Sequence, residues 1–301
     1  MTQLGEAIAV VTSLIGEDWE CPFSHEAKMK GLSNEMKGVG TTLGSKMESG
    51  TQTIRDPDQG GGTTIAKDLR PAKRPGAEDK PISLLNLKSG ERKSFALICA
   101  AHHLIPAQAS LKGCDLVPWM SAKASGSRVL QDVGYDVNGS QNGVWLPGSY
   151  AMSGKWSKMK DSEDDVSAPT DGPVSGKVEV TQFYYAICAM VTIGAQFHDA
   201  HPDYSKFVQK RLNAVAVLLA KAGHFCDKCK KKADEKKKPP PYKLVRRLNQ
   251  ISKAMSGYLH GGPGNWKKNK DIYTSRWVVS YITAIATATK KGKKFKVKSL
   301  G

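Results

Sequence analysis

The stretch SFALICAAHHLIP, residues 94–106, decides most of what this sequence predicts. Its first eight residues form a short apolar run bounded by polar neighbours, which is typical of a buried strand or a short buried helical turn. The run leads directly into His102-His103. Because imidazoles are costly to bury beside apolar strands without partners, this doublet predicts a functional site rather than a solvated face.

A second pair of histidines follows further along the chain, at His198 and His201. The chain has seven histidines, and these two pairs hold four of them. At a spacing of three residues, His198 and His201 lie on one side of a helical turn, as ligands of one ion must. One imidazole of the doublet can hold the same ion, while its neighbour projects to the opposite side of a strand and acts as a general base. The two pairs therefore predict a single divalent-metal site.

Three sequence blocks stand in order along the chain: AHHLIP at 101–106, NGVWLP at 142–147 and HDAHPDYS at 198–205. Together they resemble the AHH nucleases of the HNH and endonuclease VII superfamily, over about residues 95–220. The resemblance implies a ββα-metal finger core. We therefore expect an α+β fold in which this core is embedded in a mostly helical domain; the polar, glycine-rich composition before it predicts an extended N-terminal arm. In such a finger, a hairpin supplies the histidine doublet and a following helix closes the metal site.

The resemblance also implies catalytic roles for individual residues. His102 corresponds to a metal ligand, and His103 to the general base that takes a proton from the attacking water. His198 and His201 correspond to the second histidine pair, of which one or both complete the ligands of the ion. About 50 residues separate the second block from the third, so which of these two histidines binds the metal stays open.

Asn142 corresponds to the asparagine of the family, which would orient the base or stabilise the finger. The alternative interpretation is a simple turn former, because Asn-Gly dipeptides favour turns. The nearby Asn138-Gly139 is interpreted as a turn. Asp199 and Tyr204 are secondary candidates for contacts to the metal ligands or to phosphate.

The implied activity is that of an endonuclease that hydrolyses DNA phosphodiester bonds with little sequence specificity, using one catalytic divalent metal (Mg, Mn, Ni or Zn). Families with this motif are commonly toxins used between competing bacteria, so the resemblance implies an antibacterial effector delivered by type VI or other contact-dependent secretion. It further implies an acidic immunity protein and a secretion-apparatus or chaperone partner. The alternatives are an RNase toxin with the same site, and a non-catalytic nucleic-acid-binding module with a structural metal.

The charge of the chain is strongly segregated. The formal net charge is +17, and residues 221–301 hold 22 basic and 4 acidic residues, against 23 and 24 in the rest. Lysine clusters interleaved with aromatic residues predict phosphate contacts, whereas a solvated tail, a linker or a targeting segment is the alternative. The candidate nucleic-acid-binding residues are Lys230, Lys231, Lys232, Arg246, Arg247, Lys267 and Lys268.

The six cysteines suggest a second metal site. Cys226-x-x-Cys229 forms a knuckle, and Cys21-x-x-x-His25 offers another half-site, so the four residues together would make a closed Cys₃His zinc site. Reduced thiols are the main alternative and a disulfide the second. The other cysteines, at positions 99, 114 and 188, stand in apolar surroundings, as reduced core thiols do.

The sequence divides into an N-terminal segment packing on the body (1–30), an extended arm or linker (31–81), a nuclease core (82–223) and a basic helical extension (224–301). Helices are expected at about 202–223, 242–259 and 271–289. The uncharged stretch 180–197 contains polar residues and favours a buried helix or strand pair over a membrane span. The beginning does not match a secretory signal, so we expect synthesis in the bacterial cytoplasm, secretion without a signal peptide and action in the target-cell cytoplasm.

Overall fold

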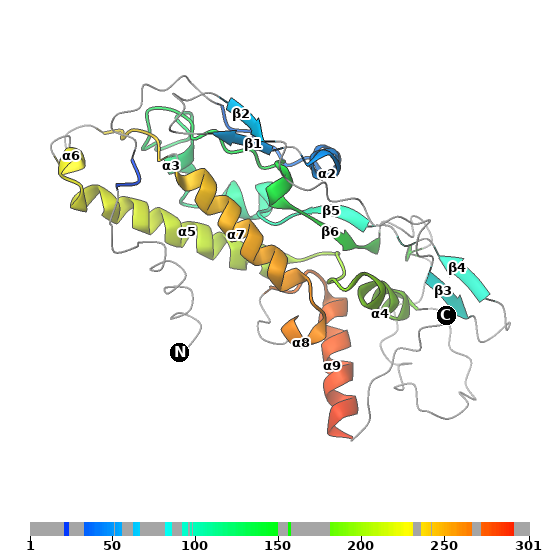
Figure 1. The fold of residues 1–301 in the computed structure, drawn as a ribbon. Helices are drawn as coiled ribbons and strands as arrows, with labels where there is room; N and C mark the ends of the chain where they lie inside the picture. Colours follow the sequence, from blue (N-terminus) through cyan, green and yellow to red (C-terminus); the bar gives the residue numbers. More distant parts are fainter. Residues whose placement is uncertain are drawn as a thin grey trace. The chain divides into compact units, whose positions relative to one another are not determined.

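The computed structural model of the chain combines helices with short two-stranded sheets, which is an α+β architecture as predicted (Figure 1). The structure describes residues 21–23, 33–50, 52–55, 63–66, 82–85, 92–95, 97, 99–149, 156–157, 181–230, 236–241, 243–266 and 272–291. Among these residues, no helix combines the length and the apolar composition that crossing a lipid bilayer requires.

The strands form three separate pairs. Strands β1 and β2 are antiparallel with Gln52 opposite Ala66, and β3 and β4 are antiparallel with Ile82 opposite Phe95. Strand β5 pairs with β6. Their bounds are β1 (Gln52–Arg55), β2 (Thr63–Ala66), β3 (Ile82–Leu85), β4 (Arg92–Phe95), β5 (Cys99–His103) and β6 (Gly143–Pro147).

Helices make up about half of the described residues. Three long ones agree with the ranges expected from the apolar periodicity, and α5 begins at Pro202, whose fixed backbone angle suits a first helical turn. The helical elements are α2 (Gly40–Ser49), the π-helical turn η2 (Ala107–Leu111), α3 (Val117–Met120), the short turn η3 (Ser140–Asn142), α4 (Gln182–Ile193), α5 (Pro202–Phe225), α6 (Asp227–Lys230), α7 (Lys243–Leu259), α8 (Pro263–Trp266) and α9 (Arg276–Lys290).

The chain folds into two compact units, each assembled from three separate segments. Unit 1 contains Met1–Pro71, His103–Asn142 and Ser205–Lys253. Unit 2 contains Ala72–His102, Gly143–Tyr204 and Ala254–Gly301. One of the divisions between the units falls between the two histidines of the doublet. The domain boundaries proposed from the sequence stay a prediction.

In unit 1, the stretch before β1 is part of the packed structure. The side chain of Asn34 donates to Met120 O at 2.9 Å and accepts from Tyr135 N at 2.8 Å. Helix α2 buries Leu43 and Met47, which stand one helical turn apart. An extended arm is therefore not confirmed at 33–50, because two apolar residues at helical spacing are enough to dock a ten-residue helix whose other positions are small or polar.

In unit 2, an aromatic core surrounds Trp277. Helix α4 packs against α9 and β6, and its buried side chains confirm the buried-helix interpretation of 180–197. Thr181 caps this helix by accepting a hydrogen bond from Tyr184 N. The indole of Trp277 lies edge-on to Trp156, with the ring centroids 6.0 Å apart, and beside Phe183.

The burial of Trp277 in this core predicts how two substitutions in α9 change the free energy of unfolding. Replacing the fully buried Trp277 by alanine should lower the free energy of unfolding by about 3–5 kcal/mol, because it removes a large apolar side chain and leaves a cavity. Val279→Ala on the same helix should change it by less than about 1 kcal/mol, since Val279 is 46% exposed. Denaturant unfolding measures both; an equal loss in the two variants would contradict the assigned core.

Candidate active site

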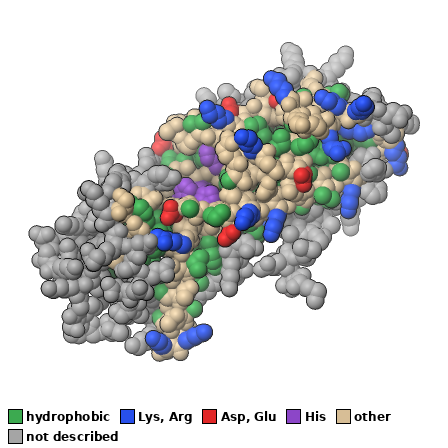
Figure 2. All heavy atoms as spheres, turned by 180° about the vertical axis from the view of Figure 1, so that it is seen from behind, with side chains coloured by type: hydrophobic (Ala, Val, Ile, Leu, Met, Phe, Trp, Pro, Cys, Tyr) green, Lys and Arg blue, Asp and Glu red, His purple; other side chains and the backbone are tan. Residues whose placement is uncertain are grey.

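Three imidazoles converge in unit 2. His102 comes from the end of β5, whereas His198 and His201 stand just before α5. One ring nitrogen from each lies within 4.8 Å of the other two, and His102 Nε2 is 3.3 Å from His201 Nε2. The structure thus brings together the three residues for which the sequence predicts metal binding. Histidine side chains are visible at the surface on the face shown in Figure 2.

The backbone around His198 is fixed by hydrogen bonds to two other parts of unit 2. His198 N donates to Pro147 O at the end of β6, at 2.7 Å, and Asp199 N donates to Thr274 O at 3.0 Å. The buried Gln196 accepts from Thr274 N through its side chain. This segment therefore enters α5 with the orientation of its two histidines set by β6 and by the chain around Thr274.

The donor set fits a divalent metal ion. Two nitrogens bound at 2.0–2.1 Å to one tetrahedral ion lie about 3.4 Å apart, close to the 3.3 Å that separates His102 from His201. His102 is 3% exposed, and the ring of Tyr204 lies edge-on to it and to His201. Burial lowers the pKa of His201, which favours the neutral imidazole that binds metals. These three residues could therefore hold one ion.

His103 has a separate set of partners, in unit 1. Its Nε2 lies 3.0 Å from Asn138 Oδ1. Two backbone groups fix the orientation of the Asn138 amide: its Nδ2 donates to Lys37 O, and its Oδ1 accepts from Val39 N. Because an amide oxygen only accepts, Nε2 of His103 must carry the proton, and Nδ1 keeps the lone pair.

The environment of His103 suits a base. Burial lowers the pKa of its imidazole, which favours the neutral ring at neutral pH. Gly38 approaches this ring so closely that a Cβ there would lie 3.5 Å from His103 Nε2 and 2.8 Å from Ala107 Cβ. A neutral imidazole with one nitrogen held by Asn138 can take a proton at the other.

Sequence reasoning missed the role of Asn138, which it interpreted only as a turn residue. The turn is present, since Gly139 N donates to Asp136 O. The side chain of Asn138 also links His103 to the segment around Lys37 and Val39 through hydrogen bonds. The sequence holds no signal for this link, as the partners on the other segment are backbone atoms.

Asn142 is buried and its side chain is saturated with hydrogen bonds. Its Oδ1 accepts from Ile105 N at 2.8 Å and from Ser252 Oγ at 2.9 Å. Its Nδ2 donates to Ile105 O and to Val137 O. With 1% of its surface exposed, this arrangement fits stabilisation of the loop after the doublet better than contact with a substrate.

The remaining candidates lie in different places. Cys21, Cys226 and Cys229 form a cluster in unit 1, whereas His25 lies outside the described residues. Among the nucleic-acid-binding candidates, Lys230 and Arg246 are exposed and Arg247 is half-buried. The others lie outside the described residues, namely Lys231, Lys232, Lys267 and Lys268.

Comparison with known proteins identifies one family. The model of AHH, a nuclease family of the HNH/ENDO VII superfamily with conserved AHH, matches residues 86–251, more than half of the chain. The matched range includes His102, His103, Asn142 and the second histidine pair. No curated protein and no solved structure matches the chain.

The hydrogen bonds predict opposite tautomers for two histidines. We expect neutral His103 to carry its proton on Nε2, and neutral His260 to carry it on Nδ1, because His260 Nδ1 lies 3.0 Å from the carbonyl oxygen of Ser256. Long-range ¹⁵N–¹H correlation spectra of the imidazole rings distinguish the two forms. An Nδ1–H tautomer at His103 would contradict the assigned orientation of Asn138.

The hydrogen bonds of the Asn142 side chain predict that this residue stabilises the fold. Asn142→Ala should lower the free energy of unfolding by about 2–4 kcal/mol, because it leaves several buried partners unpaired. Asn213→Ala is the matched control, since it removes a single exposed bond from Asp115 N and should cost less than about 1 kcal/mol. A fully stable but inactive Asn142→Ala variant would instead place this residue in the chemistry.

Proposed function

We propose that this chain, which belongs to the AHH nuclease family of the HNH/ENDO VII superfamily, is a divalent-metal-dependent endonuclease that hydrolyses phosphodiester bonds of DNA. The observation that carries the proposal is the convergence of His102, His198 and His201. His102 stands immediately before His103 in the chain. Three neutral nitrogen ligands leave positions for water and substrate on the ion. The family supports nuclease chemistry, and the ligand set supports its dependence on a metal.

In this proposal, His103 performs the proton transfer. Its Nδ1 accepts a proton from water while the water oxygen bonds to phosphorus and the P–O3′ bond breaks. Asn138 keeps the opposite nitrogen protonated and limits rotation of the ring. The leaving O3′ takes a proton from a solvent water, so the products are a 5′-phosphate and a 3′-hydroxyl.

His102, His198 and His201 would hold the ion, and a bound ion would supply electrostatic stabilisation of the phosphate and the leaving oxygen. We assign β5, β6 and the first turn of α5 as the ββα-metal core of the family. Support for this assignment comes from the pairing of β5 with β6 and from the hydrogen bond of His198 to the last residue of β6. Tyr204, in the first turn of α5, closes one side of the imidazole cluster.

The charge distribution supports a nucleic-acid substrate bound through its phosphates. The C-terminal quarter of the chain carries the net positive charge, and Lys230 and Arg246 are exposed. Contacts of this kind act on the backbone of DNA and read no sequence. We therefore propose binding that is steeply salt-dependent and cleavage that has little sequence specificity.

We further propose that the nuclease is an antibacterial effector, made in the bacterial cytoplasm, secreted without a signal peptide and active in the cytoplasm of a target cell. An acidic immunity protein would neutralise it by covering the basic surface. Support for this role comes from the resemblance to toxin nucleases and from the segregated charge.

The proposed activity is tested by cleavage of supercoiled plasmid. We expect the purified full-length protein to nick plasmid with a divalent ion and to be inactive in EDTA. His103→Ala should lower the rate at least about a hundredfold, which is the usual contribution of a general base. Ligation of the nicked product without prior phosphorylation tests for the 5′-phosphate.

The matched control is His260→Ala, which should retain activity, because His260 stands just after α7 and its Nδ1 bonds to the carbonyl oxygen of Ser256. Folding of each variant is checked by circular dichroism. A folded His103→Ala variant as active as the wild type would overturn the assignment of the base. If the protein degrades RNA in preference to DNA, the proposed substrate is wrong and RNA takes its place. Inducible expression of the wild type and of His103→Ala in bacteria tests the effector role, because only the wild type should arrest growth and degrade the chromosome.

A further inference from the structure

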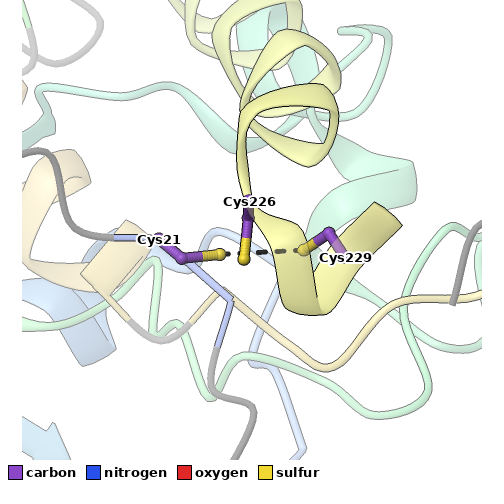
Figure 3. Close-up of side chains that lie close together, drawn as sticks. All are labelled: Cys21, Cys226 and Cys229. Carbon is purple, nitrogen blue, oxygen red and sulfur yellow. Dashed lines mark hydrogen bonds between the residues drawn. The ribbon is translucent and has the colours of Figure 1, made fainter. Parts of the chain in front are cut away.

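Three thiols meet in unit 1, at a place that the nuclease chemistry does not use. Cys21 lies in the short described stretch near the N-terminus, Cys226 follows α5, and Cys229 lies in α6. Figure 3 shows the three sulfur atoms pointing toward one another from separate segments. We propose that Cys21, Cys226 and Cys229 hold a structural zinc ion that joins the N-terminal segment to the end of α5.

The distances between the sulfur atoms fit one tetrahedral ion. All three lie within 4.8 Å of one another, and Cys21 Sγ is 3.7 Å from Cys229 Sγ. Two thiolates bound to one zinc ion at about 2.3 Å, with a tetrahedral angle between them, are separated by about 3.8 Å. A disulfide needs about 2.0 Å and would join only two of the three sulfurs. Zinc accounts for all three.

The clustering of these side chains, rather than their burial, separates them from the other cysteines. Cys226 is 7% exposed and Cys229 is 1% exposed. Cys114 and Cys188 are buried too, but neither belongs to a group of ligand atoms within the described residues. Thiols are weak hydrogen-bonding groups, so placing two buried thiols and the half-buried Cys21 against one another is poor packing unless a cation binds them.

The surrounding charge favours thiolates. Lys228 and Lys230 flank Cys229 in the sequence, and Lys238 Nζ donates to Cys229 O at 3.3 Å. Three thiolates and one zinc ion carry a net negative charge, which nearby lysines stabilise. The acidic Asp227 is highly exposed and contacts Lys230.

The site would act as a cross-link. Cys21 and Cys229 are 208 residues apart in the sequence, and closing so long a loop removes much conformational entropy from the unfolded chain. A second contact holds the same stretch, since the ring of Phe23 packs beside Trp119. The zinc ion would therefore fix residues 21–23 against the body of unit 1, independently of the nuclease function. The proposal rests on these thiolates; His25, the fourth ligand predicted from the sequence, lies outside the described residues.

Cobalt substitution tests the proposal with a readout other than cleavage. The metal is removed from the full-length protein under reducing conditions, and Co²⁺ is titrated in. We expect the near-ultraviolet charge-transfer absorption of Co²⁺–thiolate bonds, with one equivalent bound at this site and displaced by Zn²⁺. The band should persist in the His102→Ala/His201→Ala double variant, which lacks the imidazole site.

Cys226→Ser should abolish most of this absorption, and Cys114→Ser is the matched control that should retain it. Zinc analysis of the double histidine variant should give one equivalent per chain, and chelation should lower its melting temperature by several degrees. No thiolate band in the unmutated protein would overturn the proposal, even if the cysteine variants fail to fold. So would a Cys21–Cys229 disulfide mapped in freshly purified protein that retains no zinc.

Discussion

The candidate active site in unit 2 depends on one geometric constraint, the convergence of His102, His198 and His201. Three imidazoles cannot be held within 4.8 Å of one another by local sequence alone, because His102 and the pair at 198 and 201 come from distant segments. The required precision comes from the backbone. The end of β6 and the chain around Thr274 both form hydrogen bonds with the segment that carries His198. Phe197, the residue before His198, belongs to the aromatic core to which α4 and α9 contribute.

In the proposed mechanism, the two consecutive residues of the histidine doublet perform separate tasks. His102 shares its surroundings with the imidazole cluster, whereas His103 is held by Asn138 and, through it, by backbone groups of Lys37 and Val39. These two residues and Thr274 lie outside the range 86–251 that matches the family. Segments beyond the matched range thus position His103 and the chain at His198, so the proposed nuclease site depends on more of this chain than that range.

The sequence predicted the elements whose signal is local. Apolar periodicity located α5 and α7 to within a residue or two at each end. The spacing of His198 and His201 predicted that both face one ion, but the expected helical turn was wrong, because both histidines lie in the irregular segment before α5. It failed at 33–50, where only Leu43 and Met47 mark the buried face of α2. It also missed the link from Asn138 to His103, because hydrogen bonds to backbone atoms of a distant segment leave no pattern in the side chains. Asn142 was identified as important, but its four hydrogen bonds could be known only from the fold.

The two ligand clusters differ in a way that suits two different tasks. Imidazole nitrogens accept several divalent ions, and three of them leave open positions where water and phosphate can bind. Thiolates select soft or borderline ions such as zinc and bind them tightly. With an ion bound at each cluster, as we propose, the chain would exchange the ion at its imidazole site without releasing the ion at its thiolate site. This separation requires the two clusters to use different residue types. Within the part of the chain that the structure describes, the first cluster consists of histidines and the second of cysteines.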